Sequence, residues 1–72
     1  MDATKIAALI RKRRKELGIS QQKLAELSEV SLRKISDIET AFSDTSVGTL
    51  QKLLAVLGLE IRIEIKRMDH EI

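Results

Sequence analysis

The sequence predicts an all-α fold, a small domain of four helices followed by a single β-strand. The chain has 72 residues, which is enough for one domain. Residues 3–57 contain segments whose apolar residues recur at helical spacing, whereas residues 59–67 alternate between apolar and charged side chains. A domain of this size buries only about 60% of the surface of its unfolded chain, so a partner would help to stabilise it.

The expected helices span residues 3–17, 21–28, 32–40 and 47–57. Serines precede the last three helices as candidate N-caps, namely Ser20, Ser31 and Ser46. Gly18 and Gly58 end the first and the last helix, where glycine readily adopts a left-handed conformation. The side chains expected to face the core are Ile6, Leu9, Ile10, Leu17, Leu24, Ala25, Leu27, Val30, Ile35, Ile38, Val47, Leu50, Leu53, Leu54 and Leu57.

The composition argues against several kinds of protein. There is no cysteine, which rules out disulfides and thiolate metal sites. The one histidine, His70, lies beside Asp69 near the end of the sequence, where no rigid element would hold a catalytic pair, so we expect neither an enzyme nor a cofactor. No apolar run approaches about 20 residues and no signal-peptide pattern opens the chain, so a cytoplasmic protein is expected.

Charge is distributed unevenly along the chain. Residues 1–34 carry nine Lys or Arg and four Asp or Glu, a net charge of +5, whereas residues 35–72 carry four and seven, a net charge of −3. This asymmetry suggests that one face meets a polyanion and another meets protein. The basic run at 11–15 winds around a helix, so its five side chains cannot form one contact surface and most of these charges are expected to be solvated. Phe42 is the only aromatic residue, which argues against single-stranded nucleic acid as the target.

The helices at 21–28 and 32–40, joined by three residues, have the dimensions of a helix-turn-helix. Ala25 is small where the second helix passes close to the first, Val30 anchors the turn, and Ile35 and Ile38 fix the inward face of the second helix. The side chains that remain outward are Leu32, Arg33, Ser36, Asp37 and Thr40. In this motif the second helix enters the major groove of double-stranded DNA, so residues near its start would reach the edges of bases.

Four of these outward residues suit particular base contacts. Arg33 can donate two hydrogen bonds to guanine, and Asp37 can accept one from the amino group of cytosine. Ser36 can bond to either kind of base, and Leu32 can touch the methyl group of thymine. The sequence therefore predicts base readout by Leu32, Arg33, Ser36 and Asp37.

The stretch LGISQQKLAELSEVSLRKISDIE resembles the phage-repressor/Cro (XRE-type) helix-turn-helix family, and the resemblance covers residues 10–58. It is carried by Arg14, Leu17, Gly18, Ser20, Gln21, Leu24, Ala25, Val30, Ser31, Ile35, Ile38, Glu39, Thr49, Leu50, Leu57 and Gly58. It implies a lambda-repressor-like fold and a dimeric repressor on a pseudo-palindromic operator. It also implies a buried structural ion pair between Arg14 and Glu39. The DNA-backbone contacts expected with it are Gln21, Lys23, Ser31, Lys34 and Thr40.

Two positions depart from the family pattern. Glu29 occupies the turn position that usually holds glycine, and a left-handed residue there would cost about 1 kcal/mol, so a different shape of the turn is expected. The loop 41–46 contains Asp44 and no basic residue, where relatives often carry positive charge. We therefore expect weaker non-specific binding to DNA than in a relative with a more basic loop.

The strand at 59–67 lacks a partner elsewhere in the sequence. The expected partner is the same strand of a second copy, antiparallel across a two-fold axis. With the axis at Ile63, residue 60 faces residue 66 and residue 62 faces residue 64, so every charged pair across the strands is attractive. The apolar face, expected to lie on the fourth helices, consists of Leu59, Ile61, Ile63 and Ile65. The expected organisation is a helix-turn-helix domain over 1–58 (motif 20–40), a dimerisation strand over 59–67 and a flexible tail over 68–72.

A four-helix domain followed directly by a strand also resembles the HipB-like antitoxins of bacterial toxin–antitoxin operons, through the run TLQKLLAVLGLEIRIEI. This resemblance implies a nucleoid-associated homodimer that represses its own operon and binds a HipA-type kinase toxin. Two alternatives stay open. One is a phage-type repressor without a toxin partner. The other is a protein-interaction or toxin-neutralising module with weak or vestigial DNA binding. The acidic residues Glu29, Asp37 and Asp44 support this alternative.

Overall fold

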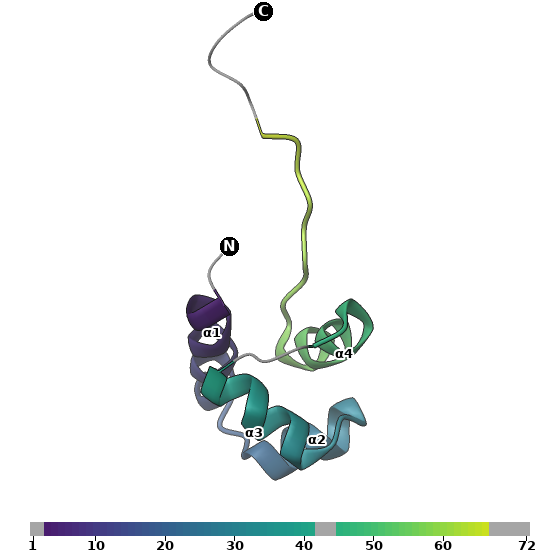
Figure 1. Ribbon diagram of the computed structural model, residues 1–72. Coiled ribbons are helices and arrows are strands. Elements are labelled where there is room, and N and C mark those ends of the chain that lie inside the picture. Colours follow the sequence, from purple (N-terminus) through teal and green to yellow (C-terminus); the bar gives the residue numbers. More distant parts are fainter. Residues whose placement is uncertain (1–2, 42–44, 67–72) are drawn as a thin grey trace, which may run out of the picture.

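Four helices form the body of the chain in the computed structural model, which describes residues 3–41 and 45–66 (Figure 1). Helix α1 spans Ala3–Glu16, α2 spans Gln21–Ser28, α3 spans Leu32–Ala41 and α4 spans Val47–Leu57. The prediction of a four-helix, all-α domain is confirmed, and each helix ends within one residue of its expected bounds. Within these ranges no helix is long and apolar enough to cross a membrane. The expectations for Phe42, Asp44, residue 67 and the tail 68–72 fall outside the described residues.

The ends of the helices follow the local chemistry of the sequence. At the start of α2 the Ser20 hydroxyl accepts a hydrogen bond from the N–H of Lys23 at 3.0 Å. At the end of α4 Gly58 is left-handed, with φ of 72°, and the N–H of Leu59 donates to the carbonyl of Leu54 at 2.8 Å. These caps satisfy backbone groups that have no partner inside the helix, and they place the helix ends where the sequence predicts them.

One apolar core lies between the helices. Helix α3 packs against α1 and α2, and α4 packs against the same two helices. The fully buried side chains are Ile10, Leu24, Ile35, Ile38, Leu53 and Leu57. All six were expected inside from their helical spacing, and burying a side chain of this size contributes about 1.5–3 kcal/mol. The core therefore fixes how α2 and α3 lie against each other.

Some side chains expected inside are exposed instead, with exposed fractions between 42% and 63%: Leu9, Leu17, Leu27 and Val47. On α1 the buried face consists of Ala7, Ile10 and Arg14, which follow one another at spacings of three and four residues. Leu9 precedes Ile10 directly and therefore points about 100° away from it around the helix. The apolar face of α1 is narrower than expected, because Leu9 lies beside it and Leu17 lies beyond the end of the helix.

The chain after α4 forms no β-strand among the residues that the structure describes. Leu59 and Ile61 pack against the core, while Ile63 and Ile65 have exposed fractions of 93% and 100%. Figure 1 shows this segment leading away from the helices, on the same side as the N-terminus of α1. Over the described part of the expected strand, residues 59–66, the prediction is therefore wrong for the single chain, because a strand needs a neighbouring strand for its backbone hydrogen bonds.

Candidate nucleic-acid interface

Hydrogen bonds hold the turn between α2 and α3. Glu29 is left-handed, with φ 62° and ψ 27°, and its N–H donates to the carbonyl of Ala25 at 2.9 Å. The Ser28 hydroxyl donates to the carbonyl of Leu24 at 2.6 Å and accepts from the N–H of Val30 at 3.3 Å. The expectation of a different turn shape is wrong: the turn keeps its left-handed residue without glycine, at a cost of about 1 kcal/mol.

Ser31 determines where α3 begins. Its hydroxyl accepts a hydrogen bond from the N–H of Lys34 at 3.1 Å, and its carbonyl accepts one from the N–H of Ile35 at 3.0 Å. Ile35 and Ile38 are fully buried beneath the helix. Helix α3 is therefore anchored along one face, while its opposite face meets solvent.

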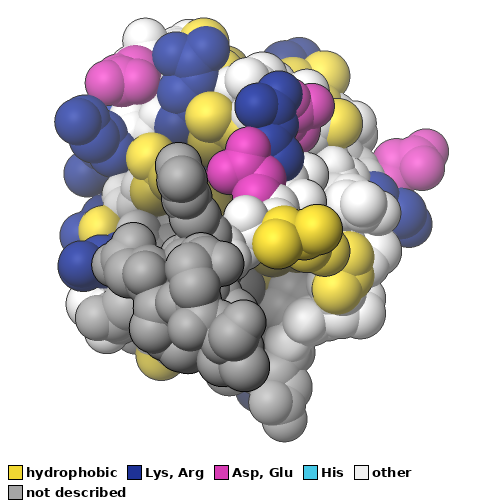
Figure 2. Space-filling view, turned by 90° about the horizontal axis from the view of Figure 1, so that it is seen from above, with side chains coloured by type: hydrophobic (Ala, Val, Ile, Leu, Met, Phe, Trp, Pro, Cys, Tyr) yellow, Lys and Arg dark blue, Asp and Glu magenta, His cyan; other side chains and the backbone are white. Residues whose placement is uncertain are grey.

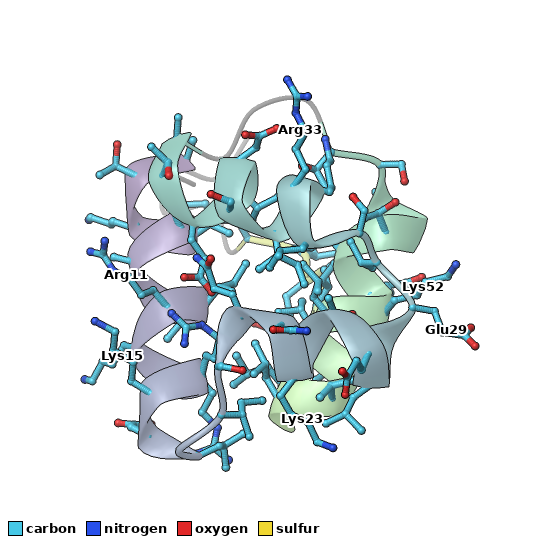
Figure 3. The ribbon with its side chains drawn as sticks, turned by 90° about the horizontal axis from the view of Figure 1, so that it is seen from below. Arg11, Lys15, Lys23, Glu29, Arg33 and Lys52 are labelled. Atoms are coloured by element: carbon cyan, nitrogen blue, oxygen red, sulfur yellow. The ribbon has the colours of Figure 1, made fainter. Side chains whose placement is uncertain are left out.

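The residues expected to read bases lie together on that outer face of α3. Leu32, Arg33 and Asp37 are exposed, and Ser36 is half-buried. Figure 3 shows the Arg33 side chain directed away from the helical body. Their spacing of one, three and four residues places them on one side of the helix, over its first turns. A guanidinium, a hydroxyl, a carboxylate and an apolar group on one helix face can distinguish base pairs in a major groove.

The residues expected to contact the DNA backbone lie on α2, on α3 and at the cap of α3, and they hold partners within the chain. The Lys23 ammonium lies 3.9 Å from the carboxylate of Glu26, and both side chains are exposed. The Thr40 hydroxyl donates to the carbonyl of Ser36 at 2.8 Å, and Lys34 is half-buried. An exposed ion pair contributes little, so Lys23 can exchange Glu26 for a phosphate at small cost.

Arg14 and Glu39 form a buried ion pair between α1 and α3. The Arg14 Nε donates to Oε2 of Glu39 at 2.6 Å and Nη2 donates to Oε1 at 2.9 Å, while Nη1 donates to the carbonyl of Ile19 at 2.9 Å. Only 8% of Arg14 and 4% of Glu39 are exposed. Since each of the three guanidinium nitrogens of Arg14 donates within the chain, this two-bond pair fixes α3 against α1.

Gln21, the first residue of α2, joins the same network. Its side-chain Nε2 donates to Oε1 of Glu39 at 3.1 Å, so the carboxylate orients the amide. An amide nitrogen carries two hydrogens, and the phosphate contact expected for Gln21 would use the second one. Through Gln21, which is half-buried, the hydrogen-bond network of Arg14 and Glu39 extends to the start of α2.

The network keeps Glu39 ionised. Burial raises the pKa of the Glu39 carboxyl. Hydrogen bonds from Arg14 and Gln21 and the charges of Arg14 and Arg11 together lower it by more than burial raises it, so the pKa lies below the ordinary value. The hydrogen bond to Glu39 in turn raises the pKa of Arg14 above its usual value. Because α1 packs against α3, the charge of Arg11 on this edge of α1 acts on Glu39.

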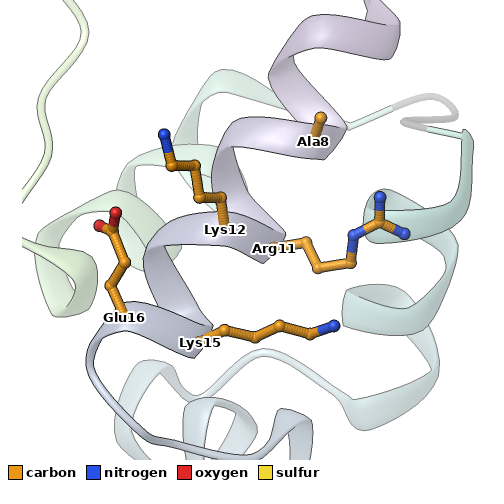
Figure 4. Close-up of a pocket in the computed structure, with 5 residues that line it drawn as sticks. All are labelled: Ala8, Arg11, Lys12, Lys15 and Glu16. Atoms are coloured by element: carbon orange, nitrogen blue, oxygen red, sulfur yellow. The ribbon is translucent and has the colours of Figure 1, made fainter.

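In the basic run at 11–15, some side chains form contacts within the chain and others are exposed to solvent. Arg13 donates from Nε to the carbonyl of Leu57 at 2.8 Å and so ties α1 to the end of α4. Arg11 and Lys15 are exposed one helical turn apart, and Figure 4 shows both directed to one side of α1, away from Lys12. Neither feature was expected from the sequence. The four-residue spacing of Arg11 and Lys15 was the available signal for a shared face.

Within the ranges 3–41 and 45–66, no cluster of three His, Cys, Asp or Glu side chains could hold a metal ion. The groups gathered at this surface are instead hydrogen-bond donors and acceptors on α2 and α3, with two cations on the neighbouring edge of α1. They are the groups with which proteins contact bases and phosphates.

Known proteins agree with this geometry. The sequence profile of the helix-turn-helix family matches residues 10–63, which include all of α2, α3 and α4. The chain is 44% identical over 48 residues to the HTH-type transcriptional regulator PuuR of Escherichia coli (strain K12), and equally to that of Shigella flexneri. Each match covers 67% of this chain and 26% of the relative, so the chain spans about a quarter of the length of these relatives. The family expected from the sequence is confirmed: the chain belongs to the XRE-type helix-turn-helix family of DNA-binding regulators.

Proposed function

We propose that the chain is a sequence-specific transcriptional repressor that binds double-stranded DNA by inserting α3 into the major groove. The observation that carries this proposal is the outer face of α3, where Leu32, Arg33, Ser36 and Asp37 lie together on a helix anchored from below. The first turns of such a helix reach the edges of bases. The name of the matched relatives, transcriptional regulator, supports the same role.

On this proposal the individual side chains have separate tasks. Arg33 donates two hydrogen bonds to a guanine, a contact that discriminates against other bases by about 1–3 kcal/mol. Asp37 accepts from a cytosine amino group, Ser36 bonds to a neighbouring base, and Leu32 packs on a thymine methyl. The buried contacts of Ile35 support these tasks, since a reading helix must hold its side chains in a fixed register along the groove.

Contacts to phosphates would come from two groups of residues. One group is the expected set on α2, on α3 and at the cap of α3: Gln21, Lys23, Ser31, Lys34 and Thr40. The second is the edge of α1 with Arg11 and Lys15; Arg14 of the same helix bonds to Glu39, which also binds Gln21 at the start of α2. Since the loop 41–46 has no basic residue, this edge would supply positive charge that the loop lacks.

The repressor would act as a homodimer whose segments 59–67 pair as antiparallel strands about Ile63. The exposure of Ile63 and Ile65 supports this pairing, as do the attractive charge pairs of that register. A two-fold dimer presents its two α3 helices to successive major-groove segments about one DNA turn apart. Sedimentation equilibrium is expected to give a dimer at micromolar concentration, and a monomer under those conditions would contradict the pairing.

Selection of binding sites from a random pool of duplex DNA, with the purified chain at about 0.1 M salt, tests the function. We expect enrichment of an inverted repeat whose half-site centres lie about 10–10.5 base pairs, or a multiple, apart. If a folded, dimeric protein enriches no sequence, DNA reading is contradicted. A protein-interaction module with vestigial DNA binding would then be the better assignment.

A narrower role is the autoregulating antitoxin of a HipAB-type operon, with a HipA-type kinase as partner. Its support is the resemblance of residues 49–65 to that branch, whereas the matched relatives are named as transcriptional regulators. A stable complex between the purified dimer and a kinase encoded beside it would support this role. Binding of the operator without any such kinase would favour a phage-type repressor that has no toxin partner.

A further inference from the structure

We propose that the groove formed by α1, α4 and residues 59–62 is the seat of Ile65 from a second copy of this chain. The inference rests on the dimer proposed above and adds the contact through which each copy completes the core of the other. The groove encloses about 210 Å³. Its lining is mostly apolar and includes Ile6, Leu9, Leu50, Leu54, Leu59 and Ile61, together with the charged residues Glu60 and Arg62 of the same segment.

The groove is where the apolar core meets solvent. Leu54 is buried and belongs to the core, Leu59 and Ile61 pack partly against it, and Leu9 is 52% exposed at the rim. Figure 2, viewed from the side on which the C-terminal segment leaves, shows apolar side chains exposed between charged ones. An exposed groove with a mostly apolar lining marks an interaction site. An apolar side chain is therefore the occupant that fits.

The C-terminal segment carries such side chains but leads them away from its own groove. Ile63 and Ile65 are 93% and 100% exposed, and Figure 1 shows their segment running outward from the helices. Alternate residues of an extended chain point to the same side, so Ile63 and Ile65 continue the apolar row that begins with Leu59 and Ile61. Within one copy, Leu59 and Ile61 of this row pack against the core, whereas Ile63 and Ile65 are exposed to solvent.

Antiparallel pairing about Ile63 brings the exposed Ile65 of each copy to the groove of the other copy. In this register residue 61 faces residue 65 of the second copy, and their side chains lie on one face with Cβ atoms about 4.5–5.5 Å apart. Since Ile61 already lines the groove, Ile65 of the second copy lies over it, against Leu9.

Charge complementarity selects a second copy as the occupant. On the polar face Arg62 lies 3.5 Å from Glu60 and 4.0 Å from Glu64 of its own chain, with all three side chains largely exposed. In the proposed register Arg62 meets Glu64 of the other copy, and Glu60 meets Lys66. The exposed charges thus find opposite partners while the isoleucines turn toward the groove.

Cysteine cross-linking tests the seat, because the native chain contains no cysteine. We expect the double variant Leu9→Cys, Ile65→Cys to form a covalent dimer on mild oxidation. The single variant Ile65→Cys is the control, since the two copies of residue 65 lie about 13 Å apart in this register, beyond disulfide reach. An oxidised monomer of the double variant, with an internal disulfide, would show that the chain fills its own groove and would overturn the proposal.

Ile63→Cys separates the seat from the dimer. Residue 63 faces its own counterpart, so this variant is expected to cross-link as well. Cross-linking at 63 without cross-linking between 9 and 65 would overturn the groove contact and leave the dimer standing. If neither variant cross-links, both the seat and the pairing are wrong. Site selection with the oxidised Ile63→Cys dimer reports on DNA reading by itself.

Discussion

Replacing Glu39 by alanine should destabilise the domain by about 3–5 kcal/mol, because the buried guanidinium of Arg14 loses its partner. The change removes two hydrogen bonds from Arg14, at 2.6 and 2.9 Å, and one from Gln21, at 3.1 Å. With 8% of Arg14 exposed, the guanidinium has little access to bulk water once the carboxylate is removed. The carbonyl of Ile19 still accepts one bond from Arg14, so we expect the lower end of that range.

A loss of this size is readily measured in so small a domain. Small proteins unfold with a free energy of about 5–15 kcal/mol in total. In a domain of this length each 1 kcal/mol shifts the midpoint of thermal unfolding by about 4–8 °C. A loss near 3 kcal/mol should therefore lower the midpoint by about 12–24 °C, followed by circular dichroism at neutral pH and at one fixed protein concentration, since dimerisation would make the midpoint depend on concentration.

The matched control is Glu16→Ala. Glu16 pairs with Arg13 at 3.5 Å on the exposed surface, and exposed pairs contribute about 0–1 kcal/mol. The double variant Arg14→Met, Glu39→Met should regain much of the loss, because it removes both buried charges together. If Glu39→Ala and Glu16→Ala lower the midpoint by the same small amount, the ion pair does not hold α3 against α1 and this reasoning is refuted.

Three further predictions concern pH, the turn and the edge of α1. Folding lowers the pKa of Glu39, so the stabilising contribution of the Glu39 carboxylate is present above the ordinary carboxyl pKa and is lost as pH falls through the folded-state pKa. The Glu39→Gln variant should therefore lose stability less steeply on acidification than the parent chain. Denaturant titrations at a series of pH values across the carboxyl range measure this difference. Glu29→Gly should raise the free energy of unfolding by about 0.5–1 kcal/mol in urea titrations, since it relieves a φ of 62°, and a less stable glycine variant would contradict that strain. Lys15→Ala should reduce the slope of log K for DNA against log salt by about one, whereas Lys52→Ala on α4 should not; equal slopes in both variants would remove the edge of α1 from the interface.

The helical body could be predicted from the sequence because local chemistry determines it. A serine before α2, a glycine after α4 and apolar residues at helical spacing fix where helices start, stop and face the core, as at Ser20, Gly58 and Ile35. The width of each buried face could not be predicted this way. Whether Leu9 is covered depends on the neighbouring elements, and these are set by the packing of the whole chain.

In the candidate site, too, some features could be predicted from the sequence and others could not. The outer face of α3 follows from spacing along one helix, so its four residues could be named in advance. The contact of Arg13 with the carbonyl of Leu57, and that of Gln21 with Glu39, join residues from different helices. Spacing along a single helix carries no information about such distances. The left-handed Glu29 shows in addition that the packed helices override the conformational preference of one residue.

The segment after α4 shows where sequence periodicity stops being sufficient. Alternation from Leu59 onward predicts an extended chain with one apolar side, and Leu59 and Ile61 do pack against the core. A β-strand is a property of two segments, since its hydrogen bonds lie between them. The single chain therefore leaves Ile63 and Ile65 exposed.

The claim that α3 reads base pairs is tested most directly by repeating the site selection with Arg33→Ala beside Lys52→Ala and the parent chain. We predict that Arg33→Ala keeps the inverted repeat but loses the preference for one base pair in each half-site, a loss of about 1–3 kcal/mol of discrimination at that position. Lys52→Ala should select the site of the parent. If Arg33→Ala selects that site with undiminished preference at every position, α3 does not read DNA through Arg33 and the central claim is contradicted.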